Sequence, residues 1–258
     1  MSHLSKLFRK KYPRFYKWYQ EITGEVYYEI LGLGLWMRLA SERRLRKLEK
    51  LYHDPIQVIC NFEGIGLYKS IRPFQVRHEI EELFRIVKDL DPQVVCEIGT
   101  DLGGTFYLWS KTRESEGLFI SIDLPRLYRK SLNRFLHSFF TKRQKVFFMR
   151  ENSHSRKCLS KVQKLLGGKK IDFLFIDGDH SYAGVEQDFL FYAPLVRKGG
   201  IIAFHDIMED HLPGNVCDVD KFWERMKKIY QHREIVADRK QIGAGIGVLY
   251  YDPEKTYE

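Results

Sequence analysis

Residues 171–189 read IDFLFIDGDHSYAGVEQDF. The first six residues form a short apolar run rich in β-branched and aromatic side chains, which predicts a buried strand. Asp177, Asp179 and His180 follow that strand directly. Charged groups are costly to bury without partners, so two carboxylates and an imidazole at the end of a core strand indicate a functional site.

Apolar runs alternate with segments of helical periodicity on both sides of this stretch. Strands are predicted over 93–99, 117–125, 145–152, 171–177, 199–207, 233–238 and 245–252, and helices over 78–90, 103–111, 128–140, 158–166, 185–196 and 219–230. This alternation predicts an α/β fold with a Rossmann-like, doubly wound sheet of seven strands, mostly parallel. No helix separates the last two strands, which predicts an antiparallel C-terminal hairpin.

In such sheets, ligands bind outside the carboxyl ends of the strands. Polar residues follow five of the predicted strands at that edge: Glu97, Gly99, Asp123, Asn152, Ser153, Asp177, His180, His205 and Asp206. Together they predict one ligand crevice.

The segment EIGTDLGG at 97–104 predicts a glycine turn that leads from a strand into a helix. Glycines allow a ligand to approach the backbone, and helix starts attract anionic groups, although the turn lacks the full GxGxxG spacing of a dinucleotide site. Asp123 can accept hydrogen bonds from a ribose diol, a device shared by NAD and S-adenosylmethionine sites. A tight turn and a helix N-cap are the structural alternatives.

Asp177, His205 and Asp206 follow two strands that should be neighbours, and they can hold a divalent cation, with Mg²⁺ or Mn²⁺ favoured by the carboxylates. A hydrogen-bonded polar cluster is the alternative. His180 can act as a general base near neutral pH, or it can cap the next helix. Asp179 can orient His180 or cap that helix. We expect Glu186 and Asp188 on the helix's solvent face.

Residues 1–70 are basic and rich in aromatic side chains, and we interpret them as a helical N-terminal extension to a domain over 71–258. Residues 1–20 carry six Lys or Arg and no acid. Such a segment can contact an anionic membrane surface, dock a partner, or pack on the main domain.

The whole chain has 258 residues and a formal net charge of +9, which favours acidic partners or reflects a basic solvated surface. Its four cysteines are scattered without metal-type spacing, which indicates reduced thiols in a cytosol. Neither a membrane-spanning segment nor a signal peptide is predicted. We therefore expect a cytoplasmic protein, with membrane-peripheral contact through the basic segment.

The sequence resembles the class I S-adenosylmethionine-dependent methyltransferases, in particular the family that includes cephalosporin-hydroxylase-like proteins and metal-dependent sugar O-methyltransferases. The resemblance covers roughly residues 75–252 and is carried by VVCEIGTDLGGT, FISIDLP, RENSHS, VDKFWERMK, GIGVL and, most specifically, IDFLFIDGDHSYAGVEQDFLFYAPLVRKGGIIAFHDI. It implies cofactor contacts at Glu97, Gly99, Thr100, Gly103, Asp123, Ser153 and Asp177, and metal ligands at Asp177, His205 and Asp206. It also implies catalytic roles for His180, as the base, and for Asp177. Metal-dependent members carry a carboxylate where this chain has His205.

These observations predict an S-adenosylmethionine-dependent O-methyltransferase with divalent-metal assistance. Its acceptor would be a sugar, a glycan or a small natural product, and a homo-oligomer is a further expectation. An RNA methyltransferase is one alternative, but the Asn/Asp-Pro-Pro-aromatic segment of amino-methylating enzymes is missing, so no nucleic-acid partner is expected. An NAD-linked oxidoreductase and an inactive cofactor-binding scaffold are the others.

Overall fold

The computed structural model describes residues 33–124, 129–210 and 217–255 and divides the chain into two compact units. The first comprises Met1–Ile71 and Pro125–Ser138, and the second comprises Arg72–Leu124 and Phe139–Glu258. The basic stretch over residues 1–20 lies outside the described residues. Among those that are described, no helix is both long and apolar enough to cross a membrane.

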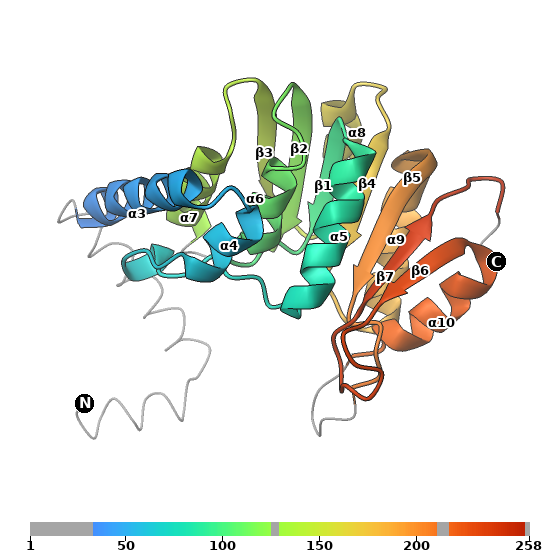
Figure 1. The fold of residues 1–258 in the computed structure, drawn as a ribbon. Coiled ribbons are helices and arrows are strands. Elements are labelled where there is room, and N and C mark those ends of the chain that lie inside the picture. The colour runs from blue at the N-terminus through green and yellow to red at the C-terminus, as the bar shows by residue number, and fades with distance from the viewer. Residues whose placement is uncertain (1–32, 125–128, 211–216, 256–258) are drawn as a thin grey trace, which may run out of the picture. The chain divides into compact units, whose positions relative to one another are not determined.

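The second unit is built around a seven-stranded sheet with the order β3-β2-β1-β4-β5-β7-β6 (Figure 1). The strands are β1 (Val94–Ile98), β2 (Gly117–Asp123), β3 (Gln144–Arg150), β4 (Ile171–Ile176), β5 (Val196–His205), β6 (Gln231–Ile235) and β7 (Ile246–Tyr250). Strands β1 to β5 run parallel, whereas β7 is antiparallel to both β5 and β6. The predicted doubly wound sheet with its antiparallel C-terminal hairpin is therefore confirmed.

Helices cover both faces of this sheet, which is why its central strands read as continuous apolar runs. The helices are α5 (Arg77–Leu90), α6 (Gly104–Ser110), α8 (Arg156–Leu166), α9 (Tyr182–Tyr192) and α10 (Val219–Ile229). Side chains of α8, α9 and α10 share one core cluster with β1, β4 and β5. On the other face, Trp109 of α6 packs edge-on against Phe173 and Phe175 of β4.

Local signals fix where the helices begin near the strand ends. The Ser155 and Ser181 hydroxyls are N-caps that accept hydrogen bonds from the backbone N–H groups of Cys158 and Gly184, both at 3.1 Å. Ser181, rather than His180 or Asp179, therefore caps α9. Asp179 accepts a hydrogen bond from the Ser181 N–H at 3.0 Å, so it supports the same turn.

The described part of the first unit is helical. It contains α3 (Leu33–Leu51), α4 (Pro55–Asn61), the 3₁₀ turn η1 (Gly66–Tyr68) and α7 (Arg129–Leu136), and the turn η2 (His137–Phe139) follows α7. Phe62 and Tyr68 pack against Phe135 of α7 with ring centroids 5.8 and 5.2 Å apart. These contacts explain why a chain segment from between β2 and β3 belongs to this unit.

Candidate functional site

Sheet register brings the carboxyl ends of β4 and β5 together. Ile176 of β4 pairs with Phe204 of β5, so Asp177 and His205 follow at the same edge of the sheet. Asp206 comes next, and His180 reaches the same point from the loop between β4 and α9. Asp177, His180, His205 and Asp206 therefore meet, as the sequence predicts.

The four side chains form a compact ring of charges. The His180 Nδ1 lies 3.0 Å from the Asp206 Oδ2, and its Nε2 lies 3.5 Å from the Asp177 Oδ1. The His205 Nδ1 lies 3.3 Å from the Asp177 Oδ1 and 3.2 Å from the Asp206 Oδ1. Each carboxylate thus faces both imidazoles.

His205 is only 7% exposed, and neither of its ring nitrogens has a hydrogen-bond partner among the described residues. Its Nδ1 is close to two carboxylate oxygens without the alignment of a hydrogen bond. Ligands of one metal ion, at bond lengths of about 2.1 Å, lie roughly 3.0–3.4 Å apart in octahedral or tetrahedral geometry. The distances of 3.3 and 3.2 Å from the His205 Nδ1 match that spacing, and all three ligand atoms lie within 4.8 Å of one another, which is compatible with a divalent cation.

The pKa values follow from this crowding of opposite charges. Hydrogen bonds to Asp177 and Asp206 raise the pKa of His180 to about 12. Burial works to lower the pKa of His205, but the charges of Asp177 and Asp206 outweigh it and raise that pKa to about 10. Burial likewise opposes ionisation of Asp177 and Asp206, yet the two imidazoles hold both carboxyl pKa values below their usual range.

Two further contacts hold the carboxylates in place. The Gln75 Nε2 donates to the Asp177 Oδ2 at 2.6 Å, and the Ala244 N–H donates to the Asp206 Oδ1 at 3.2 Å. Asp206 itself has a left-handed backbone with φ of 61°, an uncommon conformation for a non-glycine residue. Sequence reasoning missed Gln75, because nothing in the sequence around it marks a contact with a residue 102 positions away.

The glycine turn lies beside this ring. Gly99 has φ of 95°, and a Cβ there would come within 1.9 Å of the Asp177 carbonyl oxygen. Gly103, with φ of 83°, is the N-cap of α6. Both positions therefore need glycine, the first for close approach to β4 and the second for its left-handed turn.

Asp123 accepts hydrogen bonds from residues of the glycine turn, and Glu97 accepts them from residues of α6. The Asp123 Oδ2 accepts hydrogen bonds from the Thr100 and Asp101 N–H groups, each at 3.0 Å, and the Thr100 hydroxyl bonds that of Ser121. Glu97 is fully buried and accepts hydrogen bonds from the Thr105 hydroxyl and the Trp109 Nε1. Burial raises the pKa of Glu97 to about 8. Both acids make structural contacts, and their predicted contacts with a cofactor stay predictions.

A hollow of about 30 Å³ is lined by the turn, by the segment over residues 72–75 and by Asp177. Thr100, Gly104 and Thr105 line it from the turn, and Phe74, 78% exposed, lies at its rim. Ligand pockets usually measure about 300–1000 Å³. The hollow as it stands is therefore smaller than a nucleoside-sized ligand requires.

The loop after β3 holds Ser153, and its surroundings correct one expectation. The Ser153 carbonyl oxygen accepts a hydrogen bond from the Tyr192 hydroxyl at 2.9 Å. Asp188, expected on the solvent face of α9, is 0% exposed, and the His154 Nε2 lies 3.3 Å from its Oδ1. Helical spacing alone could not reveal this, because the covering residue comes from another loop.

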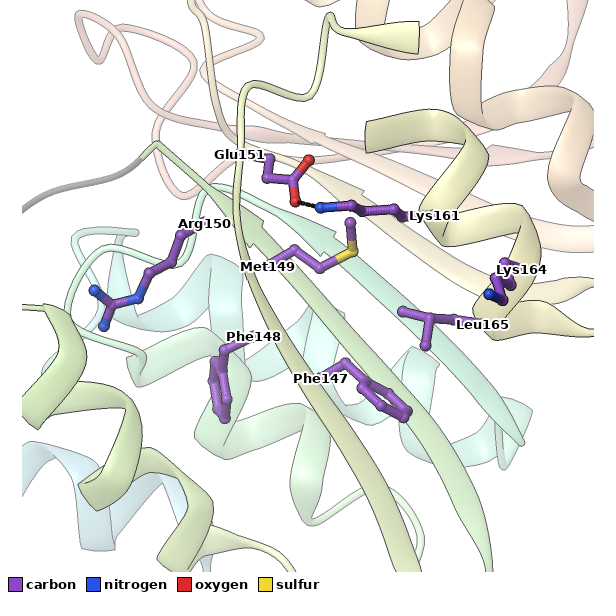
Figure 2. Close-up of a pocket in the computed structure, with 8 residues that line it drawn as sticks. All are labelled: Phe147, Phe148, Met149, Arg150, Glu151, Lys161, Lys164 and Leu165. Atoms are coloured by element: carbon purple, nitrogen blue, oxygen red, sulfur yellow. Dashed lines mark hydrogen bonds and ion pairs between the residues drawn. The ribbon is translucent and has the colours of Figure 1, made fainter. Parts of the chain in front are cut away.

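A larger groove, of about 630 Å³, lies between edge strand β3 and α8 (Figure 2). Phe147, Met149 and Leu165 give it an apolar floor, and Glu151 and Lys161 form an ion pair at one end. None of the predicted site residues lines it. Its residues do not converge on a titratable cluster at the strand ends, so the smaller hollow beside Asp177 is the better candidate site.

Comparisons with known proteins agree with the fold. Residues 96–207 match a family model described as a methyltransferase domain. An uncharacterised protein of Acanthamoeba polyphaga mimivirus is 31% identical over 140 residues, which are 54% of this chain and 62% of that protein, so the match spans less than two thirds of the relative.

Two solved structures share the fold. The O-methyltransferase TomG of Streptomyces achromogenes, involved in tomaymycin synthesis and solved with S-adenosylmethionine, is 16% identical with a TM-score of 0.53, over 69% of this chain and 81% of that chain. An O-methyltransferase of Bacillus cereus, solved with S-adenosylhomocysteine, is 17% identical with a TM-score of 0.50, over 67% and 80% of the two chains.

Proposed function

We propose that the protein transfers a methyl group from S-adenosylmethionine to a hydroxyl oxygen, a proposal supported by the match of residues 96–207 to a family model described as a methyltransferase domain. One observation carries the proposal. The ring of Asp177, His180, His205 and Asp206 lies at the strand ends, directly beside the glycine turn. Polar chemistry and a cofactor-type loop therefore share one edge of the sheet.

The cofactor would be held by the turn. Gly99, Thr100 and Gly103 would offer it close backbone approach, with Asp123 on the ribose side and Ser153 near the adenine. S-adenosylmethionine supplies an already activated methyl group. The task left to this chain is to align donor and acceptor and to remove the hydroxyl proton. Asp177 lines the hollow and also belongs to the charged ring, so it would link the cofactor site to the ring.

Asp177, His205 and Asp206 would hold a divalent cation, Mg²⁺ or Mn²⁺. The buried His205 ring, with no hydrogen-bond partner among the described residues, and its spacing from the two carboxylates support this. Such an ion lowers the pKa of a bound hydroxyl. The chain's own residues fix the donor positions, because Gln75 and the Ala244 N–H each hold one carboxylate.

His180 would take the acceptor's proton. With a pKa of about 12, set by hydrogen bonds to Asp177 and Asp206, its imidazole is a cation in the present arrangement. It can act as a base only once those carboxylates are engaged elsewhere, because their negative charge is what stabilises its proton. Proton removal by His180 is thus coupled to occupancy of the carboxylates.

The acceptor would be a sugar, a glycan or a small natural product. Phe74 supports this choice, since an exposed ring at the rim of the hollow can stack on a sugar face or a flat ring system.

Calorimetric titration of the metal-stripped protein with S-adenosylmethionine tests the cofactor part, and repetition with Mg²⁺ or Mn²⁺ and an acceptor panel tests the rest. We expect micromolar cofactor binding and metal-dependent acceptor binding. Absence of cofactor binding in folded protein would overturn the function. Cofactor binding without turnover on any acceptor would indicate a scaffold instead.

His180→Ala should reduce turnover by at least about 100-fold, the usual contribution of a positioned base, while the cofactor Kd stays the same. His53→Ala is the matched control, since His53 is exposed and lies in the other unit. Equal turnover in the two variants would remove His180 from the mechanism.

A further inference from the structure

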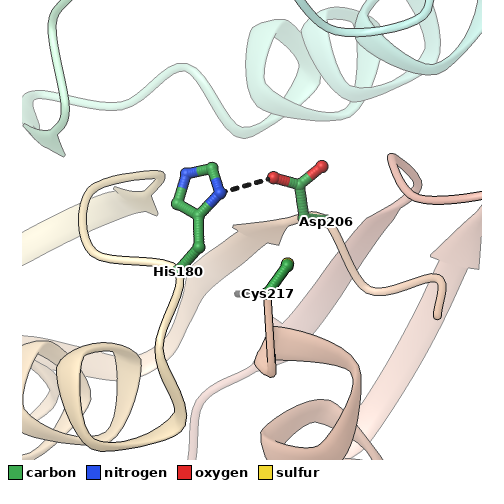
Figure 3. Close-up of side chains that lie close together, drawn as sticks. All are labelled: His180, Asp206 and Cys217. Carbon is green, nitrogen blue, oxygen red and sulfur yellow. Dashed lines mark ion pairs between the residues drawn. The ribbon is translucent and has the colours of Figure 1, made fainter. Parts of the chain in front are cut away.

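Cys217 lies beside the charged ring, although its spacing in the sequence gives no hint of this. Figure 3 shows it with His180 and Asp206, each side chain coming from a different element. His180 precedes α9, Asp206 follows β5 and Cys217 precedes α10. The ligand atoms of the three residues all lie within 4.8 Å of one another. An imidazole, a carboxylate and a thiol therefore converge.

Asp206 can serve this group and the first one at once. Its Oδ1 faces the His205 Nδ1 at 3.2 Å, and its Oδ2 faces the His180 Nδ1 at 3.0 Å. The two oxygens of one carboxylate thus belong to two different sets of ligands. The ligand set at Oδ1 is the first group, which consists of Asp206, Asp177 and His205. His205 is more than nine-tenths buried, and neither of its ring nitrogens forms a hydrogen bond to a described residue.

The backbone holds Cys217 in place. The N–H of the next residue, Asp218, donates to the His180 carbonyl oxygen at 2.8 Å, which ties the start of α10 to the loop that carries the imidazole. The Ala244 N–H holds Asp206 from the other side. These contacts fix the backbone beside Cys217 and one carboxylate oxygen of Asp206, and all three residues are partly exposed, so an ion can reach them from solvent.

The donor set indicates which ion would bind. Mg²⁺ and Mn²⁺ prefer oxygen, whereas a thiolate and an imidazole favour Zn²⁺ and similar ions. Zinc bonds to sulfur, nitrogen and oxygen are about 2.0–2.3 Å long, so tetrahedral ligands lie roughly 3.3–3.8 Å apart. The ligand atoms of the three residues, all within 4.8 Å of one another, lie near that spacing. Three protein ligands leave the fourth position open for water.

We propose that His180, Asp206 and Cys217 form a Zn²⁺ site, and that Zn²⁺ bound there inhibits methyl transfer by occupying His180. The inhibitory half rests on the proposed function, because it requires His180 to be the base. The binding half does not, since it depends only on the three donors.

Cobalt is the probe for the binding half, because a cysteine thiolate bound to Co²⁺ gives a near-ultraviolet charge-transfer band. Metal-stripped protein titrated with Co²⁺ should show this band, and Cys217→Ser should abolish it and weaken Zn²⁺ binding at least about tenfold. Cys60→Ser is the matched control, because Cys60 is also a free, partly exposed thiol. No band in the unmodified protein, or a band that survives Cys217→Ser, would overturn the site.

Inhibition is then measured with Mg²⁺ present and Zn²⁺ added. Inhibition is expressed relative to each protein's own turnover without Zn²⁺, and Cys217→Ser should raise the inhibitory Zn²⁺ concentration at least about tenfold. Equal inhibition in both proteins would refute the regulatory half. If no acceptor supports turnover, the proposed function fails by itself, and the cobalt band still decides whether the site exists.

Discussion

His205 is a buried residue whose Nδ1 lies 3.3 Å from an Asp177 oxygen and 3.2 Å from an Asp206 oxygen. Removing charged groups from water is unfavourable, and the close approach of the imidazole and the two carboxylates supplies the compensation. The imidazole of His205 and the carboxylates of Asp177 and Asp206 therefore stabilise one another. Loss of Asp177 or Asp206 alone would leave an uncompensated buried charge, so single substitutions here should affect folding as well as chemistry. Variants that keep the balance of charge and hydrogen bonding are the informative ones.

His205→Asp should shift the ion preference of the first group towards Mg²⁺. A third carboxylate replaces a nitrogen donor, and hard cations prefer oxygen. We expect the ratio of Mg²⁺ to Co²⁺ affinity to rise about tenfold or more, on the scale typical of changes around a metal. Calorimetry with each ion measures it. An unchanged ratio would mean that His205 does not contact the ion.

Glu97→Gln should change how stability depends on pH. A carboxyl whose pKa is raised by folding favours the folded state below its unfolded pKa, and that contribution is lost as the pH rises through the folded pKa. For Glu97 the window runs from 4.5 to about 8. Glutamine can still accept the hydrogen bonds from Thr105 and Trp109 without a charge.

Urea unfolding at pH 5 and pH 8 tests this. The free energy of unfolding should shift in favour of Glu97→Gln by on the order of 4 kcal/mol between the two pH values, at about 1.4 kcal/mol per pKa unit. Parallel pH profiles for the two proteins would show that Glu97 does not titrate in this range.

At the scale of elements, the site depends on how closely β1 and β4 approach at their carboxyl ends. The Asp177 N–H donates to the Ile98 carbonyl oxygen at 2.9 Å, and the Gly99 N–H donates to that of Ile122 at 2.9 Å. The glycine turn is thereby fastened to the strands on both sides. These bonds restrict the backbone of the turn and of Asp177, and they therefore also fix the position of the charged ring to which Asp177 belongs.

Gly99→Ala should cost more stability than left-handed backbone strain alone explains. Gly167, the C-cap of α8, is the matched control, because it also has positive φ but no described atom lies within 4 Å of where its Cβ would stand. We expect Gly167→Ala to cost about 1–3 kcal/mol. Gly99→Ala should cost about 1–3 kcal/mol more, because its Cβ would overlap the Asp177 carbonyl. Equal losses in urea unfolding would contradict the close approach.

The elements themselves were largely predictable from sequence. Parallel strands buried on both faces appear as apolar runs, and helices such as α5 and α10 keep one apolar side, so their positions could be predicted to within a few residues. The convergence of Asp177 and His205 was predictable as well, because neighbouring parallel strands end at one edge. Gln75, Cys217 and buried Asp188 were not, since their partners depend on how loops and helices pack.

At the scale of the whole molecule, the charge is unevenly distributed along the chain. The net charge is +9, and residues 1–20 contribute six basic residues without an acid. We propose that this segment contacts an anionic surface, whereas the strand ends carry the acidic residues of the site. Binding to an anionic surface would thus use residues 1–20, and methyl transfer would use the residues at the strand ends.

Lys10→Glu with Lys11→Glu should weaken binding to vesicles that contain phosphatidylserine. Each basic residue near an anionic surface contributes roughly 1 kcal/mol, so losing two weakens binding by about thirtyfold, and reversing their charge weakens it further. The same reversal at Lys142 and Arg143, both exposed, is the control. Cosedimentation at rising salt measures the effect. Equal binding by both variants, or retention of the unmodified chain on generic RNA instead, would contradict the expectation.

The place of β7 in the sheet has a consequence for the order in which the protein assembles during synthesis. β7 leaves the ribosome after β6, yet it lies between β5 and β6. A nascent chain can therefore pair β1 to β5, but β6 has no neighbour in the described sheet until β7 emerges. The Ala244 N–H that holds Asp206 also arrives with this final segment. Ligand binding should thus mature last, and before that point the open edge of β5 is exposed to pairing with another chain.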